Sequence, residues 1–448
     1  MIKFKWETEF KETEIGEIPG EWEVRRLKEI VRFIKGISYK SSEINSEEMG
    51  QLFITLNNFL RGGGFKNEEF KYYTGNKAKE EQRVKKGDLI IALTDMTSEA
   101  KVVGAPAIVS IPNNYDYGFI SLDCAKAISL NRISNQYLCF YLSISQEESA
   151  TFANGVNVLH LNLDHFVEHK LIPYPPPPEQ SRIATVLSWF DDLIENKKRQ
   201  NEILEKVAMA IFKSWFVDFE LFKDEEFVYS EELGKEIPKG WEVKPIGEVA
   251  EFVNGLSYKG SEKFDHYVDD SFVFITLNNI REGGGFKTEF AWIKSDRLKE
   301  RHFVKEGDLI FANTEQTKSG RLLATPAFIV FPDDYNKDRG VYSHHITKVS
   351  PNIPCIKPLL YLMFRYYQEN IAQTYHTGTG VWGFDLKNFK ENFFTLLPPQ
   401  PILQHFHSLV EPLFQKIILN QKQIMVLRKI RDALLPKLVF GKLRVEEI

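Results

Sequence analysis

The feature that most constrains this 448-residue chain is an internal repeat about half as long as the chain itself. The pattern Glu-Ile-Pro-x-x-Trp-Glu-Val occurs around Trp22 and again around Trp241, 219 positions later. The run Phe53-Ile-Thr-Leu-Asn-Asn58 recurs as Phe274–Asn279, a shift of 221. Solenoid repeats have periods of about 20 to 50 residues, so a repeat of this length is a whole folding unit. The sequence therefore predicts two similar domains in tandem.

Within each copy, short β-branched and aromatic runs alternate with clusters of Gly, Pro and Asn. In the first copy the runs are Phe53 to Leu56, Asp88 to Leu93 and Ala107 to Ile111. Residues of these types favour strands, and the clusters between them favour turns. We expect an α/β (α+β) fold in which each domain contains a twisted mixed sheet and some helix.

A proline-rich stop ends each globular copy, at Pro173–Pro178 and at Pro398–Pro401. Proline cannot continue a strand ladder, but it suits the first turn of a helix. These stops therefore predict strand-to-helix junctions. The expected globular domains are residues 1–177 and 223–398. Residues 178–222 are expected to form the first long helix, and residues 399–448 the second long helix and a C-terminal tail.

Along both expected helices an apolar residue recurs at alternating steps of three and four, the spacing of a coiled-coil seam. The seam residues are Ile183, Leu187, Phe190, Ile194, Leu204, Ile211 and Trp215 in the first helix, and Phe406, Leu413, Ile417, Ile424, Leu427 and Leu434 in the second. An antiparallel pair buries both seams within one chain. The two globular domains would then lie at opposite ends of the pair, related by a pseudo-two-fold axis.

Composition excludes several classes of protein. The N-terminal segment is charged, and no uncharged run is long enough to span a bilayer, so we expect a cytoplasmic protein without membrane contact. The three cysteines lack Cys-x-x-Cys spacing, which argues against a zinc site, and no phosphate-binding Gly-x-x-x-x-Gly-Lys-Ser/Thr motif is present. The net charge of −5 argues mildly against a nucleic-acid partner, although electrostatic attraction acts locally.

Four segments in a fixed order carry a family resemblance. They are Pro-Pro-Pro-Pro-Glu-Gln180-Ser-Arg-Ile183, Ile194-Glu-Asn-Lys-Lys-Arg-Gln-Asn-Glu-Ile-Leu204, Ala210-Ile-Phe-Lys-Ser-Trp-Phe216, and Leu427-Arg-Lys-Ile-Arg-Asp-Ala-Leu-Leu-Pro-Lys-Leu438 followed by Gly441-Lys-Leu. With these segments and its duplicated halves, the chain resembles the specificity subunits of type I restriction-modification systems over nearly its whole length. The second helix entry, Pro-Pro-Gln-Pro-Ile-Leu-Gln404, departs from the pattern because it lacks the Glu before the Gln.

The resemblance implies a non-catalytic chain that binds double-stranded DNA. Each globular half would be a target recognition domain that reads one part of a split, asymmetric site. The helices would set the gap and hold two methyltransferase (modification) subunits, and a restriction subunit with ATP-driven translocation would join them. The chain itself would bind no cofactor, and S-adenosylmethionine, ATP and Mg²⁺ would belong to the partner subunits.

Segments shared by both halves are better candidates for scaffold, and segments that differ are better candidates for base reading. Among the shared segments, a triple glycine flanked by Arg61 and Lys66, or by Arg281 and Lys287, suggests a flexible loop that presents cations to phosphate. The plain alternative is a tight turn with solvated charges. The shared pairs Tyr39-Lys40 and Tyr258-Lys259 would stack and contact phosphate, or would simply form an exposed strand edge.

Two divergent loops are the candidate readers. The first follows the Gly-Asp-Leu-Ile strand and offers Thr94, Thr97 and Lys101 in one copy, and Thr314, Gln316, Thr317, Lys318 and Arg321 in the other. Gln and Arg make bidentate contacts to adenine and guanine. The second loop, a reader or a hinge, offers Asn154, Asn157 and His160 against Thr379 and Trp382.

Two other functions were weighed. Asp88 or Asp95 with Glu99 and Lys101 superficially fits the two acids and lysine of a metal-dependent nuclease, but the second copy has Ser319 and Arg321 in place of Glu99 and Lys101. No metal site is expected. The other alternative is a repeat-based scaffold that binds protein and no DNA, which the acidic net charge favours.

Overall fold

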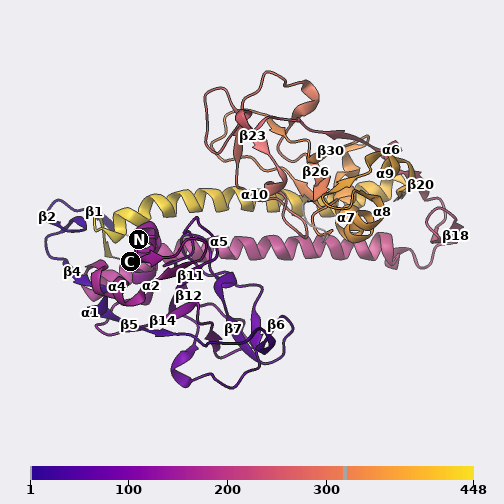
Figure 1. Ribbon diagram of the computed structural model, residues 1–448. Helices are drawn as coiled ribbons and strands as arrows, with labels where there is room; N and C mark the ends of the chain where they lie inside the picture. The colour runs from indigo at the N-terminus through magenta and orange to yellow at the C-terminus, as the bar shows by residue number, and fades with distance from the viewer. Residues whose placement is uncertain (1–2, 316–319, 448) are drawn as a thin grey trace. The chain divides into compact units, whose positions relative to one another are not determined.

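The computed structural model describes residues 3–315 and 320–447 of the chain (Figure 1). It divides into two compact units, and each unit combines one globular domain with parts of both long helices. The first unit is Met1–Asp192 with Lys429–Ile448, and the second is Leu193–Arg428. None of the helices among the described residues is long and apolar enough to cross a membrane.

The first unit is built on a four-stranded antiparallel sheet with the order β12-β10-β14-β5. Its central strand β10 (Leu89–Ala92) is apolar at every position and buried at every position, because both faces of the sheet are covered. The neighbouring strands are β5 (Val31–Lys35), β12 (Pro106–Ile108) and β14 (Cys124–Ser129). Helix α2 (Asn135–Ile144) contacts β12, and the Ser134 side chain caps it by accepting from the Tyr137 N–H.

Two further sheets complete this domain. A five-stranded mixed sheet has the order β6-β8-β7-β13-β9, in which β7 and β13 run parallel. A three-stranded sheet has the order β11-β16-β15. The bounds are β6 Ile44–Asn45, β7 Gln51–Ile54, β8 Lys71–Tyr73, β9 Arg83–Val84, β11 Thr94–Asp95, β13 Gly118–Ile120, β15 Ala153–Asn154 and β16 Leu159–Leu161. The smaller elements are β2 Phe10–Thr13, β3 Gly16–Pro19, α1 Leu27–Ile30, α3 Gln146–Ala150 and α4 Leu163–His169.

The second unit repeats all three sheets with the same strand order. They are β28-β26-β30-β21, β22-β24-β23-β29-β25 and β27-β32-β31. The bounds are β21 Ala250–Asn254, β22 Lys263–Phe264, β23 Phe272–Ile275, β24 Ala291–Ile293, β25 Phe303–Val304, β26 Leu309–Ala312, β27 Thr314–Glu315, β28 Pro326–Phe328, β29 Gly340–Tyr342, β30 Ile346–Pro351, β31 His376–Thr377 and β32 Trp382–Phe384. Its other elements are β18 Phe227–Ser230, β19 Lys235–Pro238, β20 Glu242–Pro245, α6 Ile246–Val249, α7 Lys357–Tyr366, α8 Gln368–Tyr375, α9 Leu386–Asn392 and β33 Phe394–Leu397. The duplicated mixed α/β domain predicted from the sequence is confirmed.

The two long helices are α5 (Pro177–Phe212), which ends in a π-helical turn at Lys213–Val217, and α10 (Gln400–Val439). In the first unit, Arg431 pairs with Asp191 at 2.6 Å. In the second, Asn420 donates to Asn201 at 2.8 Å and the rings of Trp215 and Phe406 lie 5.6 Å apart. Rising numbers on α5 meet falling numbers on α10, so the helices pair antiparallel within each unit, as predicted.

The expected seam residues all lie at least partly out of solvent. Ile183, Leu187, Ile194, Trp215, Phe406 and Ile424 are buried, and Phe190, Leu204, Ile211, Leu413, Ile417, Leu427 and Leu434 are half-buried. The polar interruptions of the seam find partners on the other helix. Lys197 donates to Gln423 at 2.5 Å, one turn from the Asn201–Asn420 pair. These contacts form a polar layer between apolar stretches.

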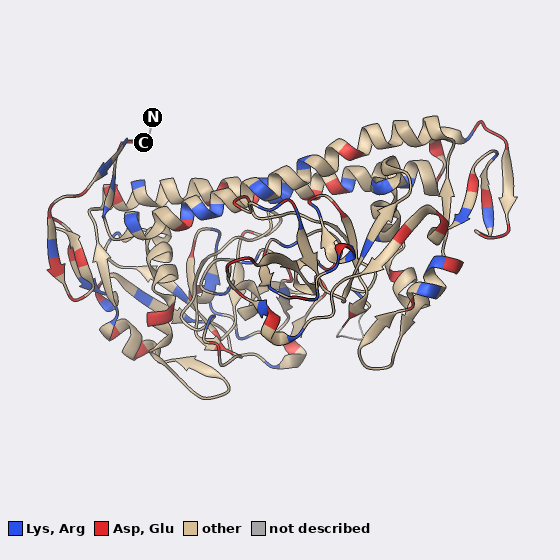
Figure 2. Ribbon diagram, turned by 90° about the horizontal axis from the view of Figure 1, so that it is seen from above, with Lys and Arg blue, Asp and Glu red and all other residues tan. Residues whose placement is uncertain are grey.

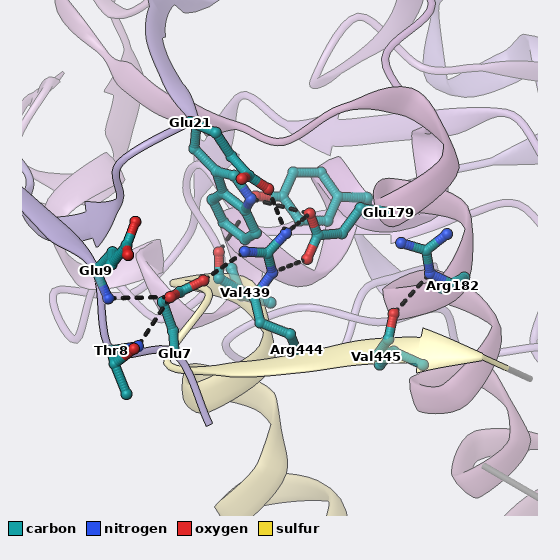
Figure 3. Close-up of polar contacts among 11 residues, drawn as sticks. Glu7, Thr8, Glu9, Glu21, Glu179, Arg182, Val439, Arg444 and Val445 are labelled. Atoms are coloured by element: carbon teal, nitrogen blue, oxygen red, sulfur yellow. Dashed lines mark hydrogen bonds and ion pairs between the residues drawn. The ribbon is translucent and has the colours of Figure 1, made fainter. Parts of the chain in front are cut away.

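The end of the chain completes the first unit. Strand β34 (Leu443–Glu447) pairs antiparallel with β1 (Lys3–Trp6), much as β17 (Leu171–Tyr174) pairs with β4 (Glu23–Arg26). Figure 3 shows Arg444 bonded to three carboxylates, at 2.6 Å from Glu7, 2.7 Å from Glu21 and 2.6 Å from Glu179. Glu179 opens α5 and is only 2% exposed. The guanidinium of Arg444, on the last strand, therefore contacts the residue after β1 and the first turn of α5.

Candidate nucleic-acid interface

The two divergent loops of the first copy meet in one sheet. Strand β11 begins the first loop, and strands β15 and β16 form a hairpin from the second. Thr94 lies opposite His160, and Asp95 opposite Leu159, because β11 and β16 run antiparallel. The turn of the hairpin, residues 155–158, therefore lies at the same edge of the sheet as the segment that follows Asp95. We call this edge the first reading edge.

The second copy has an equivalent edge, which we call the second reading edge. Thr314 lies opposite Gly383 and Glu315 opposite Trp382, in the register of the first copy. The Trp382 and His376 rings stack with their centres 4.1 Å apart, so the hairpin presents a rigid aromatic pair. Thr379 is exposed at its turn. Of the predicted readers in this copy, Gln316, Thr317 and Lys318 lie outside the described residues.

Asp95 holds the first loop in shape. Its carboxylate accepts hydrogen bonds from the Thr97 N–H and hydroxyl, both at 2.8 Å, and from the Val102 N–H at 2.7 Å. Burial acts to raise the pKa of Asp95, but the donors of Val102 and Thr97 outweigh it, and the net effect lowers the pKa. In the second copy Glu315 has the equivalent role, because its carboxylate accepts hydrogen bonds from the Leu322 and Leu323 N–H groups at 3.0 Å.

This arrangement does not assemble the acids of a nuclease. Asp95 is committed to the loop backbone, Glu99 pairs with Arg61 at 2.6 Å, and Lys101 pairs with Glu147 at 2.7 Å. Across residues 3–315 and 320–447, no three His, Cys, Asp or Glu side chains gather as they would around a metal ion.

The predicted readers divide into inner and outer residues. Thr94 is buried, and its hydroxyl contacts both Asp123 at 3.0 Å and His160 Nδ1 at 3.2 Å. Thr314 contacts His345 Nδ1 in a similar way. Thr94 therefore ties β11 to β16, whereas Thr314 is half-buried and contacts a residue outside its three-stranded sheet. The outer set is exposed or half-exposed at the edge: Lys101, Asn154, Asn157 and His160 in the first copy, and Arg321, Thr379 and Trp382 in the second.

The triple-glycine segment forms a hydrogen-bonded tight turn, the alternative to a flexible loop that the sequence left open. The Gly62 N–H donates to the Lys101 carbonyl at 2.7 Å, and the Gly64 N–H to the Pro106 carbonyl at 2.8 Å. A Cβ on Gly63 would lie 2.5 Å from the Ser143 hydroxyl oxygen, at a φ of +129° that favours glycine. The turn thus packs against the end of the first loop and against α2, and Arg61 extends from it toward Glu99.

The other predicted cations, Lys66, Arg281 and Lys287, lie next to the glycine turns of the two copies. Lys66 forms an ion pair with Glu69 at 3.0 Å, whereas Arg281 donates to the Gly284 carbonyl at 3.0 Å and Lys287 is exposed. Asn58 and Asn279, shared by both copies, are fully buried. Each donates through its amide to two carbonyls beyond the glycines. These two asparagines are therefore part of the scaffold.

Tyr39 and Tyr258 belong to small apolar clusters. The Tyr39 ring meets Phe53 edge-on at 5.2 Å, and the Tyr258 ring meets Phe274 at 4.8 Å. Burial raises the pKa of Tyr39. Lys40 and Lys259 are exposed beside them. The tyrosine rings are therefore used in packing, while the two lysines stay available for phosphate.

Charge is mixed over both units, with Lys and Arg interspersed among Asp and Glu (Figure 2). At the first reading edge the cations Arg61 and Lys101 are 66% and 45% exposed, and each rests on an acid. Exposed ion pairs of this kind contribute little to stability. A phosphate can replace the acid as the partner of either cation.

Comparison with known proteins shows which protein family this chain matches. A family model described as the type I restriction modification DNA specificity domain matches residues 19–206. The MjaIX specificity subunit of Methanocaldococcus jannaschii is 39% identical over 461 residues, covering 100% of this chain and 99% of that one. The HindI specificity subunit of Haemophilus influenzae is 21% identical over 86% of this chain and 94% of its own. The crystal structure of an S subunit from M. genitalium shares the fold, with a TM-score of 0.53, 17% identity, and coverage of 93% and 96%.

These matches assign the chain to a class of DNA-specificity proteins. At 39% identity over its full length, this chain belongs to the family of type I restriction enzyme specificity subunits, as its motifs predicted.

Proposed function

We propose that this chain is the DNA-reading, non-catalytic subunit of a type I restriction-modification complex and that each unit reads one half of a bipartite, asymmetric site. The observation that carries the proposal is the duplicated three-stranded sheet. Its inner residues are equivalent in both copies, whereas the residues at its exposed edge differ. Bases are read by side chains at their edges, so two different edges on one scaffold suit two different half-sites.

The helices supply the docking surface for the two modification subunits. In the second unit, α5 exposes Leu193, Ile203 and Val207, and α10 exposes Leu409, Leu419 and Val426, each between 38% and 51% exposed. Their spacing places each set on one face of its helix, beside the buried seam. Exposed apolar stripes of this kind mark protein interfaces. S-adenosylmethionine belongs to the modification subunits, and ATP and Mg²⁺ to a restriction subunit.

The test is methylation by this chain co-expressed with a methyltransferase subunit from the same genome, read by single-molecule sequencing. In a loop-exchange variant, residues 96–101 are replaced by the sequence of residues 316–321. We expect the wild-type complex to methylate adenine in a split motif, and the variant to alter one half of that motif. The control variant, Asn113→Asp with Asn114→Asp, takes the residues of the second copy in the exposed segment between β12 and β13 and should leave the motif unchanged.

Two outcomes would reject the proposal. A change in both halves of the motif after the loop exchange would contradict one unit reading one half. A stable complex that methylates no specific sequence would favour the protein-binding scaffold.

A further inference from the structure

The first reading edge carries two apolar side chains that the fold leaves in water. Val156, in the hairpin turn, is 84% exposed, and Met96, just after β11, is 69% exposed. Among large hydrophobic residues of the described chain, these two are the most exposed. Single exposed apolar residues are common on protein surfaces, so exposure alone carries no conclusion.

Their placement is what makes this pair informative. Asp95, the last residue of β11, lies opposite Leu159, the first residue of β16. Met96 therefore follows the strand at the edge where the turn with Val156 enters β16. Two residues that are 60 positions apart in sequence project from one edge of one small sheet.

Both residues are held by rigid backbone. Gly155 has a φ of +127°, and a Cβ there would lie 2.0 Å from the Val158 carbonyl oxygen, so the turn requires glycine. Asp95 fixes the segment after Met96 through its bonds to Thr97 and Val102. The backbone that carries the two apolar groups is thus positioned before binding, and neither side chain contributes to the core.

The second copy changes the chemistry at both positions. By sequence, Gln316 corresponds to Met96 and Thr379 to Val156. The supporting framework remains, because Gly378 has a φ of +86° and a Cβ there would lie 2.6 Å from the Val381 carbonyl oxygen. If the fold required apolar residues at this edge, both copies would have them. The apolar pair is therefore suited to a feature of the first half-site that the second half-site lacks.

We propose that Val156 and Met96 contact the C5-methyl group of a thymine in the half-site read by the first unit. The thymine methyl is the apolar feature among the base edges in the major groove, where adenine, guanine and cytosine present hydrogen-bonding groups. A contact between methyl groups removes apolar surface from water on both sides. This inference rests on the proposed function and specifies what one of its edges reads.

The test removes one methyl group from the DNA side of the contact and the two γ-methyl groups of Val156 from the protein side. The probe is a duplex carrying the motif that the wild-type complex methylates, with the thymines of each half replaced singly by deoxyuridine. We measure binding by the complex of this chain with its modification subunits. At one position in the half altered by the loop exchange, we expect deoxyuridine to weaken wild-type binding about fivefold, the effect of about one buried methyl.

The Val156→Ala complex should bind the thymine duplex about fivefold more weakly than wild type and should lose sensitivity to deoxyuridine at that position. Val381→Ala, an exposed valine in the turn of the second hairpin, is the matched control and should keep the sensitivity. Thermal unfolding should be the same for all three proteins, because both valines are exposed.

The inference is overturned if that half-site contains no thymine, or if Val156→Ala retains the full response to deoxyuridine at every position. Both results leave a specific split motif in place. Failure of the proposed function looks different, because the wild-type complex would then show no sequence-specific binding at all.

Discussion

The indole N–H of Trp22 donates to the carboxylate of Glu179 across 3.0 Å, with both residues buried. Trp241 is the equivalent residue of the second copy, and its indole nitrogen is buried without a partner, since the entry to α10 contains no glutamate. Phe216, Phe219 and Phe222 surround it instead, with ring centres 5.0 to 5.7 Å away. The two equivalent tryptophans are therefore buried in different surroundings: Trp22 against an ionic network and Trp241 among aromatic rings.

Replacing the cation at the ionic entry should destabilise the first unit strongly. Arg444→Met leaves Glu179, which is 2% exposed, as a buried charge without its cation, and we expect a loss of about 3 kcal/mol in the free energy of unfolding. Urea unfolding followed by fluorescence measures it. Lys3→Ala removes an exposed ion pair with Glu447 in the same two-stranded ribbon and should cost less than about 1 kcal/mol. Equal losses in the two variants would show that the Arg444 network is merely a surface feature.

A methyl group on Gly155 should abolish reading by the first hairpin. Gly155→Ala places Cβ 2.0 Å from a carbonyl oxygen at a φ that disfavours alanine, so the turn must change shape. We expect the methylated motif to lose specificity in one half only. Gly380→Ala, in the other hairpin, meets nothing within 4 Å and should leave the motif intact. An unchanged motif with Gly155→Ala would contradict a role for this turn.

The first loop should lose its internal support in acid. Because the folded state lowers the pKa of Asp95 below its ordinary value of 3.8, the ionised carboxylate stabilises the fold above that pH, and this stabilisation is lost as the pH falls through the folded pKa. Asp95→Asn should cost about 2 kcal/mol at pH 7, since it leaves donors of Thr97 and Val102 poorly matched. Thermal unfolding of both proteins between pH 7 and 3 should show this difference constant down to about pH 4 and shrinking below it. A difference that grows in acid would refute the assignment.

The polar layer between the helices should set their register at a cost in stability. Asn420 is fully buried, and its carbonyl oxygen has no hydrogen-bond partner. We expect Asn201→Leu with Asn420→Leu to stabilise the protein by about 1 to 3 kcal/mol and to produce motifs with more than one spacer length. Urea unfolding and single-molecule sequencing measure these effects. Gln415→Leu on the exposed face of α10 is the control. A destabilised double variant with a single spacer would argue against this role.

The duplication, the sheet-rich domains and the antiparallel helices followed from the sequence because each leaves a local signature. Repeats, proline stops and a three-and-four apolar spacing are visible in one dimension. The joining of Thr94 with His160 was not visible, because strand pairing across 66 residues leaves no local mark. The triple glycine left two interpretations open for a related reason: a positive φ with close packing, as at Gly63, requires glycine as firmly as flexibility does.

The exposure of Val156 cannot be predicted from the sequence, because valine is more often buried than exposed. Only its 84% exposure separates it from Val158, two positions away and half-buried. Asp95 was considered as a catalytic acid, since a carboxylate after a strand suits both metal binding and loop capping. Its hydrogen-bond partners decide between the two.

The residues from Lys429 onward belong to the first unit, where β34 supplies the only partner that β1 has among the described strands. A ribosome therefore releases the N-terminal domain long before the segment that finishes it has been made. While the second domain is being synthesised, β1 lacks its partner strand β34, and the carboxylates of Glu7 and Glu179 lack their ion-pair partner Arg444. A premature stop near residue 428 would consequently damage the domain that was translated first, and the later one would be left with nearly all of its contacts.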